Sequence, residues 1–191
     1  GETTSRPSAP AAVAWPKDAA GRESLESMLI APQGPFTVSD NYNLNAYGEI
    51  TLAAGTEPMR QPTDVGRPGS ADALAQAKRN GEVAVTLDDG ASRAFMTNAA
   101  AKNSPLPYLT DDSSIQVGNG VTFTKPVVVD YRYNLWRLQP TGDLVGGDPN
   151  GVLPVRFTGD TRTPAPRATG GDLTVASFNV LNYFTTTGEQ L

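Results

Sequence analysis

The chain has 191 residues, a net charge of −5, and neither cysteine nor histidine. This length suits one medium domain, or one domain with a part of another. The missing residue types exclude disulfides, a histidine general base and thiolate or imidazole metal ligands within these residues. The acidic balance argues against a global electrostatic attraction to nucleic acid, and no apolar run reaches the roughly 20 residues of a membrane-spanning helix. The chain starts at Gly1 rather than Met, so we expect it to be an excerpt whose natural start has been removed.

The N-terminal part, residues 1–22, is rich in Ala, Pro, Ser and Thr. This composition predicts a flexible segment, with Trp15 packed on the domain as an anchor. Alternating apolar residues then predict a β-meander, with strands at 26–32, 36–40 and 49–53 and a polar loop at 41–48.

A long Gly- and Pro-rich loop leads to the one good helical pattern, at 71–80. Ser70 is a suitable N-cap and Gly81 a suitable C-terminal stop. Beyond this helix, Asp89-Gly90 is typical of a type I′ hairpin turn between two strands.

The strongest β pattern covers residues 117–141. A turn with Asn134 in the left-handed region is expected to join its two strands. Strict alternation predicts which side chains share a face: Val127, Val129, Tyr131 and Tyr133 against Val128, Asp130 and Arg132 before the turn, and Trp136 and Leu138 against Arg137 and Gln139 after it.

Short strands, one short helix and long loops predict a mainly β fold. The best match is a small OB-like β-barrel (an oligonucleotide/oligosaccharide-binding barrel) over 23–157, with an edge strand at 152–157. Residues 158–171 form a Pro/Gly-rich linker. A dense apolar strand at 172–184 cannot form a domain by itself, so 172–191 is interpreted as the truncated start of a second domain.

This last strand carries a family resemblance. The stretch ASFNVLNYF, after a Pro-rich linker and Gly-Gly, resembles the opening strand of the endonuclease/exonuclease/phosphatase (DNase I-like) superfamily, and in particular its bacterial extracellular nucleases. The similarity covers roughly residues 24–187. Upstream, the segments ESLESMLI, FTVSDNYNLNAYGEITL, QPT, LDDG and VVVDYRYNLWRLQPTG look like the OB-like domain that precedes the catalytic domain in those nucleases.

The resemblance implies a secreted or cell-surface parent enzyme that hydrolyses nucleic-acid phosphodiesters with Mg²⁺ or a similar divalent cation. Asn179 matches the catalytic Asn of the first strand, which would position the scissile phosphate and the metal. The family's metal-binding Glu, its Asp/Asn pair and its two His would lie beyond Leu191. The chain itself is therefore expected to be inactive, to bind no cofactor, to have no complete metal site and no membrane partner, and to associate with its catalytic domain.

Nucleic-acid binding by the OB-like part is a separate hypothesis. Single strands bind such barrels through aromatic and basic side chains. One hairpin contains Tyr131, Arg132, Tyr133, Trp136 and Arg137. They form either a binding platform or ordinary barrel packing with solvated arginines, and alternation prevents one face from presenting all five. A wholly different alternative is an extracellular module that binds a saccharide or a surface protein and has no link to a nuclease.

Acidic pairs offer little support for a metal site. Asp88-Asp89, Asp111-Asp112 and the region 143–148 lack the spacing of an EF-hand. The first pair is better explained as part of the hairpin turn. No phosphate-binding loop pattern occurs either, which argues against nucleotide hydrolysis of that type.

Overall fold

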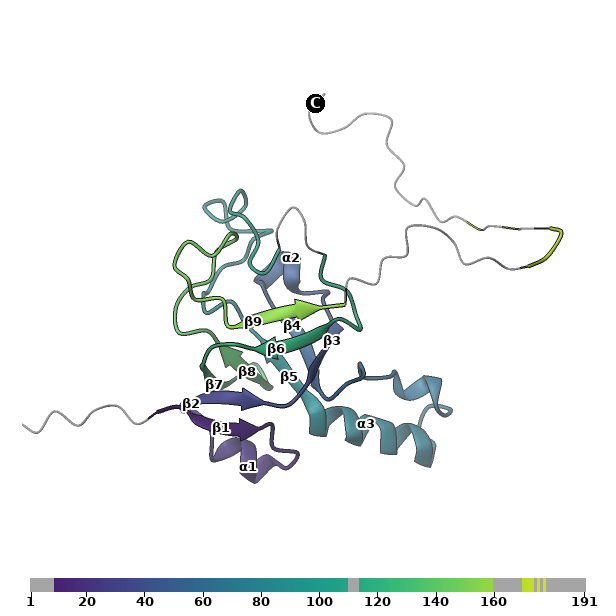
Figure 1. Ribbon diagram of the computed structural model, residues 1–191. Coiled ribbons are helices and arrows are strands. Elements are labelled where there is room, and N and C mark those ends of the chain that lie inside the picture. Colours follow the sequence, from purple (N-terminus) through teal and green to yellow (C-terminus); the bar gives the residue numbers. More distant parts are fainter. Residues whose placement is uncertain (1–8, 110–113, 160–169, 174, 176, 178–191) are drawn as a thin grey trace, which may run out of the picture. The chain divides into compact units, whose positions relative to one another are not determined.

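The computed structural model describes residues 9–109, 114–159, 170–173, 175 and 177. Contacts divide the chain into two units, Gly1–Thr161 and Arg162–Leu191. The first unit contains all the helices and strands of the described residues, and it is mainly β, as the sequence predicts (Figure 1). Most of the expected strand at 172–184, with Asn179, lies outside the described residues.

One nine-stranded sheet forms this unit, in the order β1-β2-β7-β8-β5-β4-β3-β6-β9. Its strands are β1 (Ala11–Ala14), β2 (Leu29–Gln33), β3 (Phe36–Asp40), β4 (Ile50–Ala54), β5 (Ala84–Leu87), β6 (Gly120–Phe123), β7 (Val127–Arg132), β8 (Leu135–Gln139) and β9 (Val155–Thr158). The helices are α1 (Ala19–Glu23), α2 (Leu44–Tyr47) and α3 (Ala71–Val83), with a 3₁₀ turn at Pro62–Asp64. The sequence predicts only α3, because the two short helices lack a detectable period.

The sheet curls into a half-barrel whose inner face is the apolar core (Figure 1). Alternation along each strand sends one set of side chains inward. Paired strands keep these sets together, as Ile50 opposite Leu87 and Val129 opposite Leu138 show. All four side chains are fully buried.

The outer face carries polar side chains at its centre. The register of four strands brings Thr51 beside Thr86, Thr86 beside Arg137, and Arg137 beside Asp130. Thr86 and Arg137 are nevertheless buried, at 3% exposure each. Loops therefore cover this part of the outer face, and the buried polar groups need partners within the protein.

The N-terminal segment 1–22 differs from the expected flexible tail, because its described part forms β1 and α1. β1 adds to the sheet edge in parallel with β2. The side chain of Trp15 is buried, as predicted, and its ring meets that of Trp136 edge-on at 6.5 Å.

The expected meander is wrong in its first strand. β3, β4 and β5 follow one another as antiparallel neighbours, but β2 pairs with β1 and β7 instead of β3. The chain bends at Gly34, whose φ is 95°, so that β2 and β3 meet different partners. The turn residues around Gly34 predict the bend between β2 and β3, but they do not specify which strands β2 and β3 pair with.

Two further local predictions are also wrong. The helix α3 begins after the Ser70 cap as predicted but continues through Gly81 to Val83, and it ends where Ala84 pairs with Ala53 of β4. Asp89-Gly90 forms no type I′ hairpin, since Asp89 lacks the positive φ that this turn requires. The neighbours of β5 are β4 and β8, and β8 lies parallel to it.

The β7–β8 hairpin confirms the left-handed turn at Asn134, whose φ is 62°. Tyr133 shares this conformation, with a φ of 54°. Two consecutive left-handed residues are the signature of a type I′ turn. Tyr133 therefore leaves the strand alternation, and the predicted face shared by Val127, Val129, Tyr131 and Tyr133 is wrong in its last member.

Substitution of Gly48 tests how tightly the loops pack on the outer face. Gly48 ends α2 with a φ of 74°, and an added Cβ would lie 2.7 Å from both Asp89 Oδ2 and Pro107 Cγ. We expect Gly48→Ala to lower the free energy of unfolding by about 2–4 kcal/mol, from left-handed strain and steric overlap together. Urea denaturation measures this loss.

Gly34→Ala is the matched control, because Gly34 also has a positive φ but has open space around it. It should cost only the strain, about 1–2 kcal/mol. Equal losses in the two variants would contradict tight packing against Gly48.

Candidate functional site

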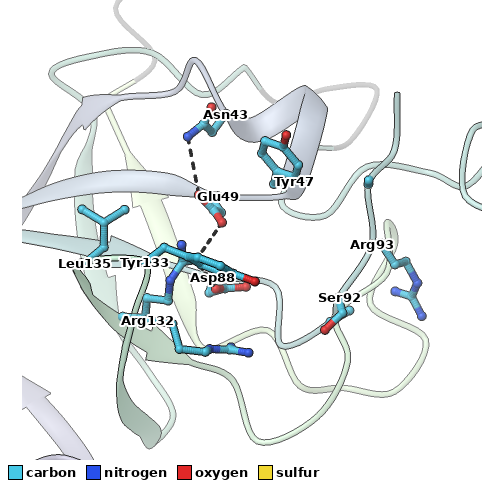
Figure 2. A pocket seen from close by; sticks show the side chains of 12 residues that line it. Asn43, Tyr47, Glu49, Asp88, Ser92, Arg93, Arg132, Tyr133 and Leu135 are labelled. Atoms are coloured by element: carbon cyan, nitrogen blue, oxygen red, sulfur yellow. Dashed lines mark hydrogen bonds and ion pairs between the residues drawn. The ribbon is translucent and has the colours of Figure 1, made fainter. Parts of the chain in front are cut away.

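A pocket of about 540 Å³ opens on the outer face of the sheet. This volume lies in the range of small-molecule sites in proteins. The connection from β3 to β4, the end of β5 with the segment after it, and the β7–β8 hairpin supply its walls (Figure 2). The lining residues are Asn43, Tyr47, Glu49, Asp88, Ala91, Ser92, Arg93, Ala94, Arg132, Tyr133, Leu135 and Arg137.

Arg137 forms the floor of the pocket, with a side chain that is only 4% exposed. Its Nη1 donates to Glu49 Oε1 at 2.7 Å and to Asp88 Oδ2 at 2.5 Å. Gln139 Nε2 also donates to Asp88 Oδ2, at 3.0 Å. Removal of Glu49 or Asp88 would leave the buried charge of Arg137 less well compensated, which is strongly destabilising.

The carboxylates keep the Arg137 guanidinium charged. Burial by itself lowers the pKa of Arg137, but the hydrogen bonds and charges of Glu49 and Asp88 outweigh it and raise that pKa above its usual value. The Nε of Arg137 is buried and has no hydrogen-bond partner among the described residues. The floor thus holds a fixed cation.

Two aromatic rings border the pocket. Tyr133 is 84% exposed, and its ring lies 5.6 Å from the guanidinium carbon of Arg137. This distance is typical of a cation–π contact. Tyr47, from α2, is half-exposed. Figure 2 shows Tyr133 and Arg132 on one side of the opening, with Ser92 and Arg93 on the other.

The other two arginines of the pocket are also paired with carboxylates. Arg132 Nε lies 2.5 Å from Asp130 Oδ2, and Arg93 Nη2 lies 3.2 Å from Asp143 Oδ2. The pocket is therefore polar and aromatic, and its positive charges are balanced locally.

The structure divides the five residues of the predicted platform. Arg132, Tyr133 and Arg137 line the pocket. Tyr131 and Trp136 lie on the opposite face as a cross-strand pair, with ring centroids 4.7 Å apart. Trp136 also packs on Trp15 and so belongs to the core side.

The sequence predicts only three of the twelve residues that line the pocket, namely Arg132, Tyr133 and Arg137. Asn43 and Tyr47 were assigned to a polar loop, Glu49 to a strand, and Asp88 to a hairpin turn. Their convergence depends on the register of β4, β5 and β8, which brings Glu49 and Asp88 to the same guanidinium. The usable signal was a lone arginine among apolar residues in a strand, because such a charge requires carboxylate partners from elsewhere.

Behind the pocket, the carboxyl group of Asp89 is completely buried. Its Oδ1 accepts from the Ala91 N–H at 2.8 Å, while Oδ2 has no partner among the described residues. Burial raises the pKa of Asp89 to about 7; the Ala91 hydrogen bond opposes this shift and the charge of Asp88 adds to it. Since the Asp89 carbonyl also accepts from the Leu144 N–H, this residue anchors the pocket wall that follows β5 to a second loop.

Within 9–109, 114–159 and the few described residues beyond, no three Asp or Glu side chains converge as metal ligands. No helix among them has the length and apolar content to span a membrane.

No protein-family model, curated protein or solved structure matches this chain.

The buried Asp89 predicts a specific dependence of stability on pH. Its pKa is about 7 in the folded protein and near 3.8 when unfolded, so the unfolded state releases the proton first as pH rises. Its contribution to stability is fully present below about pH 4 and is lost between pH 4 and 7, by roughly 3–5 kcal/mol in total. We expect Asp89→Asn to remove this loss and to stabilise the protein at pH 8.

Urea denaturation at pH 4.5 and pH 8 measures the effect as a difference between variants. Asp64→Asn, which makes the same charge change at an exposed position, is the control and should follow the wild type. A wild-type curve parallel to that of Asp89→Asn would show that Asp89 titrates normally.

Proposed function

We propose that the chain is the non-catalytic, OB-like accessory domain of a secreted, metal-dependent nuclease, and that its pocket binds single-stranded nucleic acid. The observation that carries the binding role is the meeting of exposed aromatic rings and arginines in one pocket on the outer face of a curled β-sheet. Aromatic and basic side chains are what single strands require of a binding groove.

The strand connections support an OB-like barrel. In that fold the first strand is bent and pairs with both the second and the fourth, while the third lies parallel to the fifth. Here the bent segment β2–β3 pairs with β7 and β4, and β5 is parallel to β8. One feature departs from the pattern: α3 lies between β4 and β5, before the third barrel strand instead of after it.

The position of the pocket supports the binding role. OB-folds bind oligonucleotides and oligosaccharides on the face of their second and third strands, between the loop after the first strand and the loop before the fifth. With the correspondence above, these are β4, β5, the segment 41–49 and the β7–β8 turn. The segment 41–49 supplies Tyr47 and Glu49 to the pocket, Asp88 follows β5 directly, and Tyr133 comes from the turn.

The nuclease assignment depends on the resemblance of the sequence. ASFNVLNYF resembles the first catalytic strand of DNase I-like enzymes, and the upstream segments look like the domain that precedes it. The parent would cleave phosphodiesters with Mg²⁺ or a similar ion, using Asn179 with partners that this chain does not contain. The accessory domain would hold the single-stranded nucleic acid near that catalytic domain.

Binding of a fluorescent single-stranded oligonucleotide by the whole chain tests the proposal. We expect Tyr133→Ala to weaken binding by about tenfold, the effect of losing one stacking ring. Tyr131→Ala is the matched control, because it removes a half-exposed ring of the same hairpin from the opposite face. Fluorescence anisotropy measures the affinities.

Three results would count against the proposal. Equal losses in the two variants would place the strand elsewhere, and tighter binding of oligosaccharides than of oligonucleotides would favour a saccharide-binding module. We also expect the chain alone with Mg²⁺ to leave a labelled DNA or RNA intact. Metal-dependent cleavage inhibited by EDTA would contradict the accessory role.

A further inference from the structure

We infer that the pocket selects nucleobases that carry an exocyclic amino group, such as cytosine and adenine. Glu49 accepts a hydrogen bond from this amino group, and contacts with phosphate add little to the binding affinity. This inference rests on the proposed function and specifies its ligand. The charges and hydrogen-bonding groups of this pocket favour the edge of a nucleobase over the sugar-phosphate backbone of the bound strand.

The charges of the pocket are balanced, which disfavours phosphate as the group it binds. Each of its arginines already has a carboxylate partner: Asp88 and Glu49 for Arg137, Asp130 for Arg132, and Asp143 for Arg93. A phosphate would have to displace these partners or lie beside them. Because strong phosphate binding requires cations that exchange small counterions for the phosphate, the pocket lacks the charge that makes most nucleic-acid binding salt-dependent.

The carboxylate of Glu49 can accept a further hydrogen bond. Oε1 is used by Arg137, whereas Oε2 accepts from Asn43 Nδ2 at 3.5 Å, the limit of a hydrogen bond. The Glu49 side chain is 15% exposed and lies on the pocket wall near Tyr133 (Figure 2). A carboxylate oxygen accepts hydrogen bonds, so it attracts an amino group and disfavours both a phosphate and the O4 carbonyl oxygen of thymine or uracil.

The ring of Tyr133 is placed where a base could stack on it. Tyr133 is held in the left-handed region, where a bulky side chain is strained, and its ring is nevertheless exposed to solvent. Its contact with the buried Arg137 keeps the ring beside the floor of the pocket. A planar base can therefore stack on this ring beside the floor of the pocket.

The test compares RNA homopolymers that differ in the group proposed to be read. Oligo(C) and oligo(U) of equal length carry the same backbone, but cytosine has a 4-amino group where uracil has an oxygen. We expect the whole chain to bind oligo(C) about tenfold more tightly than oligo(U), the discrimination of one good base contact. The logarithm of affinity should fall with the logarithm of salt concentration with a slope of about −1 or shallower, as for at most about one phosphate contact.

The variant Glu49→Gln tests the reading residue. Its amide keeps the shape of the side chain and a hydrogen bond to Arg137, but it adds a donor suited to the oxygen of uracil. We expect the preference for oligo(C) to fall at least fivefold. Glu57→Gln, the same change at an exposed position outside the pocket, should retain the wild-type ratio.

The outcomes separate this inference from the proposed function. Binding with no difference between oligo(C) and oligo(U), or with a slope as steep as that of several phosphate contacts, would overturn base selection and leave strand binding standing. A preference that survives Glu49→Gln would overturn the role of Glu49. If neither homopolymer binds, the proposed function itself fails. The comparison in the wild type needs no variant to fold.

Discussion

The buried guanidinium of Arg137 is the constraint on which the outer face of the sheet depends. It comes from β8, and its two carboxylate partners lie just before β4 and just after β5. A charge in this position is tolerated only with good hydrogen-bond geometry, so the pairing of the three strands must be correct at once. A slip of one residue in β8 would turn the charge of Arg137 toward the apolar core. The ion pairs therefore specify the arrangement more than they add to its stability.

The same interaction builds the pocket. With Glu49 and Asp88 held at the floor, the loops that carry Tyr47 and Tyr133 close around it. The left-handed Tyr133 is explained in this setting, because its ring covers a guanidinium that would otherwise face water on one side. Asp89, one residue beyond the floor, extends the buried polar network into the neighbouring loops. Structure and binding surface thus depend on one connected set of polar contacts.

Charge pairing also makes the acidic chain compatible with the nucleic-acid ligand that we propose. A net charge of −5 disfavours long-range attraction of a polyanion. Such a protein gains affinity from stacking and from base-edge hydrogen bonds, which need close contact and little net charge. The pocket offers aromatic rings, a carboxylate acceptor and arginines whose charges are balanced, and this combination suits the proposed binding of single-stranded nucleic acid.

The sequence by itself determined the mainly β class, the Ser70 cap of α3, the strand β3 from Phe36 to Asp40, the burial of Trp15 and the turn at Asn134. Each of these depends on neighbours in the chain: a period of two, a capping hydroxyl, a residue that accepts a positive φ. Tertiary structure decided the strand order, the fate of Asp89-Gly90 and the meeting of Glu49, Asp88 and Arg137. The reason is that strand pairing brings Arg137 to Asp88, which lies 49 positions earlier in the chain, and to Glu49, which lies 88 positions earlier. No local pattern in the sequence specifies which two strands will pair.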